Sequence, residues 1–177
     1  MSDHLSHDVE SFRKEKNVYF GSDADSPIPE EDRNPFKGLK YFPPSLEYRV
    51  KARLSRFEKP EAITMATSKG AIRPYLKYGE FVFELHGRKL RLFAYKAADD
   101  RFDRSLFVPF TDETSGRESY GAGRYLELEE AKSDEHTLDF NMAYNPYCAY
   151  NENYVCPLPP RENRVHLAVR AGEKNYK

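Results

Sequence analysis

The two cysteines and the polar residues around them are the side chains of this sequence whose types could carry out chemistry. Both lie in the segment 138–163, which reads LDFNMAYNPYCAYNENYVCPLPPREN. Cys148 and Cys156 are spaced C-x7-C, which is too wide for a zinc knuckle, and no closely spaced pair of histidines accompanies them. The sequence therefore predicts that neither cysteine is a metal ligand.

Cys148 is a candidate nucleophile. If Asn145 caps a helical turn with Pro146 at its first position, Cys148 is the third residue of that turn. The positive end of the turn would lower the pKa of the thiol, which suits a hydrolase that pairs a cysteine with a histidine. Asp139 is a second, weaker catalytic candidate. We favour the alternative of two small buried side chains over a disulfide, which a reducing cytosol disfavours.

Arg124 is the charged residue that the pattern constrains most. It has the same strand parity as Leu126 and Leu128, so its side chain is predicted to point inward at the end of the sheet. A buried guanidinium needs a carboxylate or an anionic ligand. Three acidic residues are candidate partners: Asp112, Asp139 and Glu162. We favour a structural ion pair over an anion bound by Arg124.

Two loops are predicted to meet at the candidate site, 111–125 and 145–163. Irregular chain of this length in a compact domain is often functional. Gly121-Ala-Gly123 is only a fragment of a phosphate-binding fingerprint and leads into a strand, so it predicts a turn or bulge. The tyrosines of 144–154 are predicted to pack the second loop. The candidate ligand-binding residues are Asp112, Arg124, Asp139, Asn141, Asn145, Glu162 and Asn163.

An N-terminal helix and an irregular strap are predicted to precede the body of the protein. Leu5, Val9 and Phe12 recur at helical spacing, which predicts an amphipathic helix over residues 4–17. Residues 22–46 contain five prolines and are predicted to run as a strap over a sheet. Four apolar residues are expected to hold the strap against the body: Phe36, Leu39, Tyr41 and Phe42.

Alternating apolar and polar residues predict short strands in most of the remaining chain. The expected strands are 48–55, 63–67, 71–77, 81–85, 90–94, 106–110, 125–129, 137–141 and 165–169. Pro74 places the third of them at a sheet edge. Eight or nine short strands predict a mainly β, antiparallel barrel or sandwich-like domain. We expect one domain over 1–177, with the helix and strap at 1–46 and the β body at 47–177.

Composition excludes several classes of function. A net charge of −1 over 177 residues argues against nucleic-acid binding. No stretch has the length and apolarity of a membrane span, and the polar N-terminus does not resemble a secretory signal, so we expect a cytoplasmic protein that does not bind membranes. Cofactor and oligomeric state are unknown from the sequence.

Several strings in the sequence resemble one uncharacterised family of bacteria and archaea. They are LFVPFTDETSG (106–116), YGAGRYL (120–126), DFNMAYNP (139–146), CAY (148–150), CPLPPREN (156–163) and AGEK (171–174), with further similarity at 41–44 and 79–85. The family is domain of unknown function number sixteen eighty-four. The resemblance implies a single domain over the full length and carries no catalytic residues. Tyr147 departs from it, since a second proline is expected there.

These observations support three hypotheses. The first is binding of a small polar or anionic ligand between the 111–125 and 145–163 loops, because carboxylates, amides and one arginine converge there. The second is a hydrolase-type enzyme that uses Cys148. The third is a structural or protein-interaction module in which the polar side chains only satisfy buried backbone groups.

Overall fold

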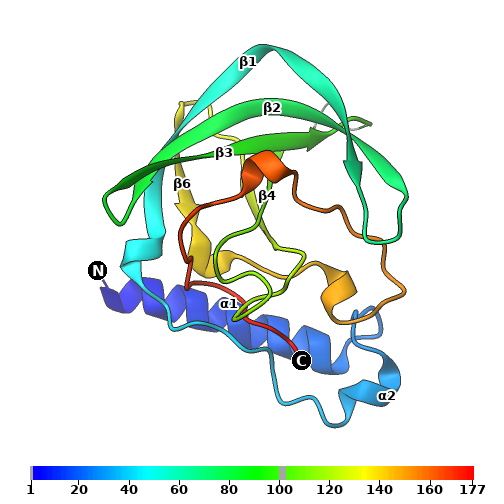
Figure 1. The fold of residues 1–177 in the computed structure, drawn as a ribbon. Coiled ribbons are helices and arrows are strands. Elements are labelled where there is room, and N and C mark those ends of the chain that lie inside the picture. Colours follow the sequence, from blue (N-terminus) through cyan, green and yellow to red (C-terminus); the bar gives the residue numbers. More distant parts are fainter. Residues whose placement is uncertain (1, 100–102) are drawn as a thin grey trace.

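The computed structural model describes residues 2–99 and 103–177. Among these, six strands form one antiparallel sheet in the order β5-β4-β3-β2-β1-β6, which curves into a nearly closed barrel (Figure 1). The strands are β1 (Arg49–Ala66), β2 (Ile72–Leu85), β3 (Arg88–Ala97), β4 (Ser105–Phe110), β5 (Arg124–Glu129) and β6 (Glu135–Asp139). The predicted mainly β, antiparallel architecture is confirmed.

Helices are few. Helix α1 (Ser2–Ser22) is followed by α2 (Glu30–Arg33) and by four 3-10 turns, at Leu46–Tyr48, Phe140–Met142, Tyr147–Ala149 and Arg161–Asn163. Figure 1 shows α1 along the side of the molecule opposite the β1–β2 ribbon. The helix is longer than the predicted 4–17 because Phe20 docks on the body, where its buried ring meets Tyr150 edge to face at 5.0 Å. No described helix is both long enough and apolar enough to span a membrane.

The strands are longer and fewer than predicted because bulges join segments that the pattern separates. The expected strands 48–55 and 63–67 are one strand, β1, whose pairing with β2 shifts between Arg56 and Glu61. The expected strands 71–77 and 81–85 are likewise joined in β2, next to Gly79. A side chain at Gly79 would meet the Ser55 carbonyl at 2.7 Å, so glycine permits the close approach of the two strands.

The predicted strand 165–169 is wrong. The segment contains no strand, although Val165 and Val169 are buried in the core as their alternation indicates. The backbone N–H of Val169 donates to Oδ2 of Asp112 at 2.7 Å instead of to a neighbouring strand. The predicted strand 137–141 also ends early, at Asp139, because the Asp139 carboxylate accepts the backbone N–H of Asn141 and caps a 3-10 turn.

The strap is held against the body largely as expected. Leu39 and Phe42 are buried, while Phe36 and Tyr41 are partly buried. Arg13 of α1 reaches over the strap, with its guanidinium 4.3 Å from the centre of the Tyr41 ring and Nη1 donating to the Phe42 carbonyl at 2.9 Å. The strap is therefore clamped between the helix and the body.

A carboxylate network fastens the chain after β5 to the bulged part of the sheet. Oε1 of Glu130 accepts hydrogen bonds at 2.7 Å from Nε of Arg56 and from the Tyr78 hydroxyl, and Oε2 accepts one at 2.7 Å from Nζ of Lys96. Burial acts to raise the pKa of Glu130, but the hydrogen bonds from Lys96, Arg56 and Tyr78 outweigh it and lower the pKa to about 2.

We expect Glu130→Gln to lower the free energy of unfolding by about 2 kcal/mol at neutral pH, from the size of the pKa shift with allowance for partial exposure. Because the folded-state pKa is depressed, the contribution is fully present above the unfolded-state pKa near 4.5 and is lost as the pH falls toward 2. Urea unfolding at pH 7, 4 and 2.5 should show the difference shrinking. Glu129→Gln, at an exposed neighbour, is the control, and a difference independent of pH would contradict the prediction.

Candidate functional site

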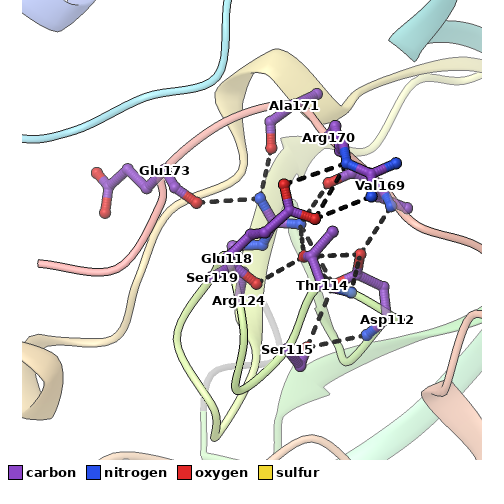
Figure 2. Close-up of polar contacts among 10 residues, drawn as sticks. All are labelled: Asp112, Thr114, Ser115, Glu118, Ser119, Arg124, Val169, Arg170, Ala171 and Glu173. Carbon is purple, nitrogen blue, oxygen red and sulfur yellow. Dashed lines mark hydrogen bonds and ion pairs between the residues drawn. The ribbon is translucent and has the colours of Figure 1, made fainter.

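Arg124 lies at the start of β5 with its side chain 0% exposed. Nη2 of Arg124 donates to the Val169 carbonyl at 2.8 Å and contacts Oδ1 of Asp112 at 3.3 Å, while Nη1 donates to the carbonyls of Ala171 and Glu173 (Figure 2). Burial lowers the pKa of the Arg124 guanidinium and Asp112 opposes that effect. The predicted inward orientation is confirmed, and of the three candidate carboxylates Asp112 is the one that pairs with Arg124.

Asp112 organises the loop that follows β4. Its carboxylate accepts hydrogen bonds from the backbone N–H and the hydroxyl of Thr114, from the Ser115 hydroxyl and from the Val169 N–H (Figure 2). The Thr114 hydroxyl is also 2.7 Å from the Ser119 hydroxyl. Arg124 and Asp112 thus tie the 111–125 loop to the C-terminal segment 169–173, and their observed partners are all protein groups.

Asn141 and Asp139 hold the strap. The buried Asn141 amide accepts the Ser45 N–H and donates to the Ser45 carbonyl, both at 2.9 Å, and it also donates to Oδ1 of Asp139. A carboxamide that binds both backbone groups of one residue imitates a strand partner. Neither Asp139 nor Asn141 contacts Arg124, so the two remain separate from the Arg124–Asp112 pair.

Asn163 bridges a gap in the sheet. Strands β3 and β4 pair directly at Tyr95 and Phe107. Beyond that point Oδ1 of Asn163 accepts the Phe93 N–H at 2.8 Å, while Nδ2 donates to the carbonyls of Phe93 at 2.9 Å and Pro109 at 2.8 Å. Its neighbour Glu162 accepts the Tyr95 hydroxyl at 2.6 Å and Nζ of Lys77 at 2.9 Å. Both predicted site residues therefore fasten the 145–163 loop to the sheet.

In the sequence, Asn145 is a candidate cap for the turn that contains Cys148. In the structure Asn145 does not cap this turn. Pro146 precedes the 3-10 turn Tyr147–Ala149, and the Asn145 amide donates to the Lys174 carbonyl at 2.9 Å. The reason is Glu173, whose 1% exposed carboxylate accepts the Asn145 N–H at 2.8 Å and the Tyr150 hydroxyl. Glu173 also pairs with Nζ of Lys16 at 2.5 Å. The string 171–174, which contains Glu173, was noted in the sequence, but no role was assigned to Glu173.

The 111–125 and 145–163 loops do meet, at Cys148. The Tyr120 hydroxyl is 3.6 Å from Sγ of Cys148, and the N–H of Cys148 donates to Sγ of Cys156 at 3.3 Å. Both thiols are free. No histidine is a hydrogen-bond partner of Cys148 in the described part of the chain, and the ring of His136 contacts Ala131 and Asp134 instead. Among the described residues, the observed hydrogen-bond partners of Cys148 are thus Tyr120 and Cys156.

A hollow of about 800 Å³ lies among α1, the ends of β2 to β5 and the segment 144–157. Its walls are aromatic. The aromatic residues are Phe12, Tyr19, Phe20, Tyr75, Tyr95, Phe107, Tyr125, Tyr144, Tyr147 and Tyr154. Five charged side chains also line it: Glu15, Lys16, Arg73, Asp103 and Glu127. We call this hollow the aromatic pocket.

The rings of the aromatic pocket support one another. Tyr75 stacks on Phe107 with centroids 5.6 Å apart, Phe107 meets Tyr125 edge to face at 4.8 Å, and Tyr125 meets Tyr144 at 5.6 Å. The Tyr125 hydroxyl donates to the Pro157 carbonyl, so the strand wall is tied to the loop wall. Burial raises the pKa of Tyr125 and of Tyr144, and both phenols are neutral. The pocket wall is thus a mutually packed, uncharged aromatic surface.

None of the seven predicted ligand-binding residues lines the aromatic pocket. Their ligand-binding role stays a prediction. One signal in the sequence could have indicated the pocket: Tyr95 and Ala97, Ser105 and Phe107, and Tyr125 and Glu127 are each two residues apart, and so share one face of the sheet. The tyrosines at 144, 147 and 154 were assigned to packing alone, and they also form the opposite wall.

Comparison with known proteins identifies the family to which the chain belongs. The model of the family described as "Protein of unknown function (DUF1684)" matches residues 34–174. The chain belongs to this family. The DUF1684 match covers the sheet, both loops and Glu173, whereas the α1 wall of the pocket precedes it. No curated protein matches the chain.

A solved structure of similar sequence has the same fold. It is the solution NMR structure of an uncharacterized protein from Haloarcula marismortui, which is 43% identical to this chain. The match covers 97% of this chain and 95% of that one, with a TM-score of 0.74. The coverage shows that the similarity extends beyond the DUF1684 match.

Proposed function

We propose that this DUF1684 protein binds a small organic molecule with a flat, mainly apolar body in the aromatic pocket. The observation that carries the proposal is the hollow of about 800 Å³ walled by ten aromatic side chains. Ligand sites in proteins are typically concave, about 300–1,000 Å³ in volume and mainly apolar, with a few polar groups that set orientation. The ring-on-ring packing of the wall supports a site that exists before the ligand arrives.

The charges around the pocket favour a cationic group on this ligand. Lys16 is already paired with Glu173, which leaves Arg73 as the remaining cation beside the carboxylates of Glu15 and Glu127. The faces of aromatic rings also attract cations. Arg73 in addition donates to the Val155 carbonyl at 2.9 Å. We therefore propose an amine-bearing ligand, in place of the polar or anionic ligand expected from the sequence.

The other hypotheses receive less support. A hydrolase that uses Cys148 would need a base beside the thiol, and the described contacts of Cys148 are with Tyr120 and Cys156. An interaction module would not need a large aromatic hollow. We propose a cytoplasmic location, consistent with two free thiols and with the composition.

Ligand binding is tested with matched probes of opposite charge, tryptamine and indole-3-acetate. We expect tryptamine to raise the Tm of the wild-type protein in a saturable way and indole-3-acetate to have a much smaller effect, because the rim carries more carboxylates than cations. Ala97→Trp should abolish the tryptamine effect, since Ala97 lines the pocket and an indole side chain would fill it. Thermal-shift titration and calorimetry provide the measurements.

Two further variants make this test decisive. Ala62→Trp, at an exposed position of β1, adds the same side chain away from the pocket and should leave tryptamine binding intact. Glu127→Gln should weaken the amine several-fold and leave a neutral indole unaffected. Equal binding of tryptamine to wild type and Ala97→Trp would show that the aromatic pocket is not the site. A preference for indole-3-acetate would overturn the proposed charge of the ligand.

A further inference from the structure

We infer that Cys148 and Cys156 are an oxidation site, at which a hydroperoxide converts the two thiols into a reversible intramolecular disulfide. The proposal begins from their separation. The backbone N–H of Cys148 donates to Sγ of Cys156 at 3.3 Å, so the second sulfur lies against the main chain of the first cysteine. Disulfide formation requires this kind of proximity before oxidation.

The local chain can accommodate the bond. Cys148 lies in the 3-10 turn Tyr147–Ala149, and Cys156 lies in irregular chain just before a single bridge between Pro157 and Thr67. The Cys156 backbone is held by Ser68, whose hydroxyl accepts the Cys156 N–H at 3.1 Å and whose N–H donates to the Cys156 carbonyl at 2.9 Å, so the bond would form chiefly by rotation of the two side chains. Joining the sulfurs closes a short loop over residues 148–156, which limits the entropic gain from the cross-link and keeps it readily reversible.

The two thiols have different environments, which assigns them different steps. Cys148 is partly exposed, so it is the thiol that a hydroperoxide reaches. The Tyr120 hydroxyl, 3.6 Å from Sγ of Cys148, can donate a hydrogen bond to the thiolate. Cys156 is only 7% exposed, and burial raises its pKa to about 11. Cys156, the less exposed thiol, thus acts second, with the Cys148 N–H directed at its sulfur.

The chemistry balances with one molecule of hydrogen peroxide, the simplest hydroperoxide. The Cys148 thiolate attacks the peroxide oxygen, the O–O bond breaks, and Cys148 becomes a sulfenic acid while hydroxide leaves and is protonated to water. The sulfur of Cys156 then attacks the sulfenic sulfur, the S–O bond breaks, and a second water leaves as the S–S bond forms. The two thiols are oxidised by two electrons in total and the hydroperoxide is reduced. A dithiol reverses the reaction by exchange.

Oxidation would also change the aromatic pocket. Cys156, Tyr147 and Pro157 all line it. Drawing Sγ of Cys156 onto Cys148 would move this part of the wall, so the disulfide is expected to alter the affinity for the amine probe. This consequence rests on the proposed function, whereas the formation of the disulfide does not.

Peroxide treatment of the full chain tests the site. We expect wild-type protein treated with hydrogen peroxide and then alkylated to lose the mass of two hydrogen atoms and to resist alkylation at both cysteines. Glu152 lies between the two cysteines, so cleavage after glutamate should give two peptides joined only through the disulfide. Dithiothreitol should separate them. Linked dimers, or Cys148 sulfinic acid without the cross-link, would overturn the inference.

Serine variants and the amine probe separate the two proposals. Cys156→Ser should accumulate sulfenic acid on Cys148, detectable with dimedone, and Cys148→Ser should remain unmodified under the same conditions. Tryptamine binding should change on oxidation of the wild type and stay constant for Cys156→Ser. A disulfide that forms in a protein without tryptamine binding would contradict the proposed function and sustain the oxidation site. Tryptamine binding without formation of a disulfide would contradict the oxidation site and sustain the proposed function.

Discussion

Arg124→Met should destabilise the protein by about 3–5 kcal/mol, the range for removing one member of a buried ion pair. The methionine would leave the Asp112 carboxylate without its cation and three backbone carbonyls, of Val169, Ala171 and Glu173, without their donor. Each orphaned buried acceptor carries a desolvation cost of its own. Urea unfolding followed by circular dichroism gives the free energy of unfolding. A variant that fails to fold would represent the largest possible loss of stability.

Arg170→Met is the matched control for Arg124→Met. Arg170 lies on the surface and pairs with Glu118 at 3.0 Å, so its loss should leave the free energy of unfolding close to that of the wild type. Arg124→Lys should recover only part of the stability, because an ammonium cannot reproduce the fork of the guanidinium. If Arg124→Met unfolds within 0.5 kcal/mol of the wild type, then the buried pair is not what secures the 111–125 loop.

Asn163→Leu should cost about 3 kcal/mol or more, although leucine is apolar and of similar size. The change leaves the Phe93 N–H and the carbonyls of Phe93 and Pro109 unpaired at a site where Asn163 is 0% exposed. At about 1–3 kcal/mol for each unpaired buried group, the loss outweighs any gain from apolar burial. Hydrogen exchange offers a local readout, since the Phe93 amide should lose protection more than the amides of the β1–β2 pair.

Asn153→Leu provides the comparison for Asn163→Leu. Asn153 is exposed, and its substitution should change the free energy of unfolding by less than about 0.5 kcal/mol. Uniform loss of protection across the whole sheet in Asn163→Leu, with no excess at β3 and β4, would show that Asn163 stabilises the fold without bridging these two strands.

The sequence predicted the sheet better than it predicted the site. Side-chain alternation found 125–129, and an almost continuous apolar run found 106–110, both almost at their true bounds. The same alternation cannot detect a bulge, which divides β1 and β2 in the pattern although each is continuous. Alternation also cannot distinguish a strand from buried irregular chain, and for this reason the predicted strand at 165–169 was wrong. In a strand and in a buried irregular segment alike, burial of every second side chain produces the alternation, whereas the hydrogen-bond partners of the backbone differ.

The sequence predicted those parts of the candidate site whose geometry depends on residues close together in the chain. Strand parity was enough to place Arg124 inward and to include Asp112 among its partners. The aromatic pocket depends on the docking of α1 against residues more than one hundred positions away, and on strand ends that the register brings together. Such contacts between distant parts of the chain leave no local pattern. The tyrosines on the loop side of the pocket were therefore assigned to packing alone.

The ion pair between Lys16 and Glu173 joins residues 157 positions apart, and this separation has a consequence during synthesis of the chain. Translation releases α1 before the segment 150–173, with Phe20 exposed until its partner Tyr150 has been made. The helix must therefore wait for this segment before it can dock, so the aromatic pocket forms only after all the strands have been synthesised. A chaperone that covers the apolar face of α1 would act in this interval.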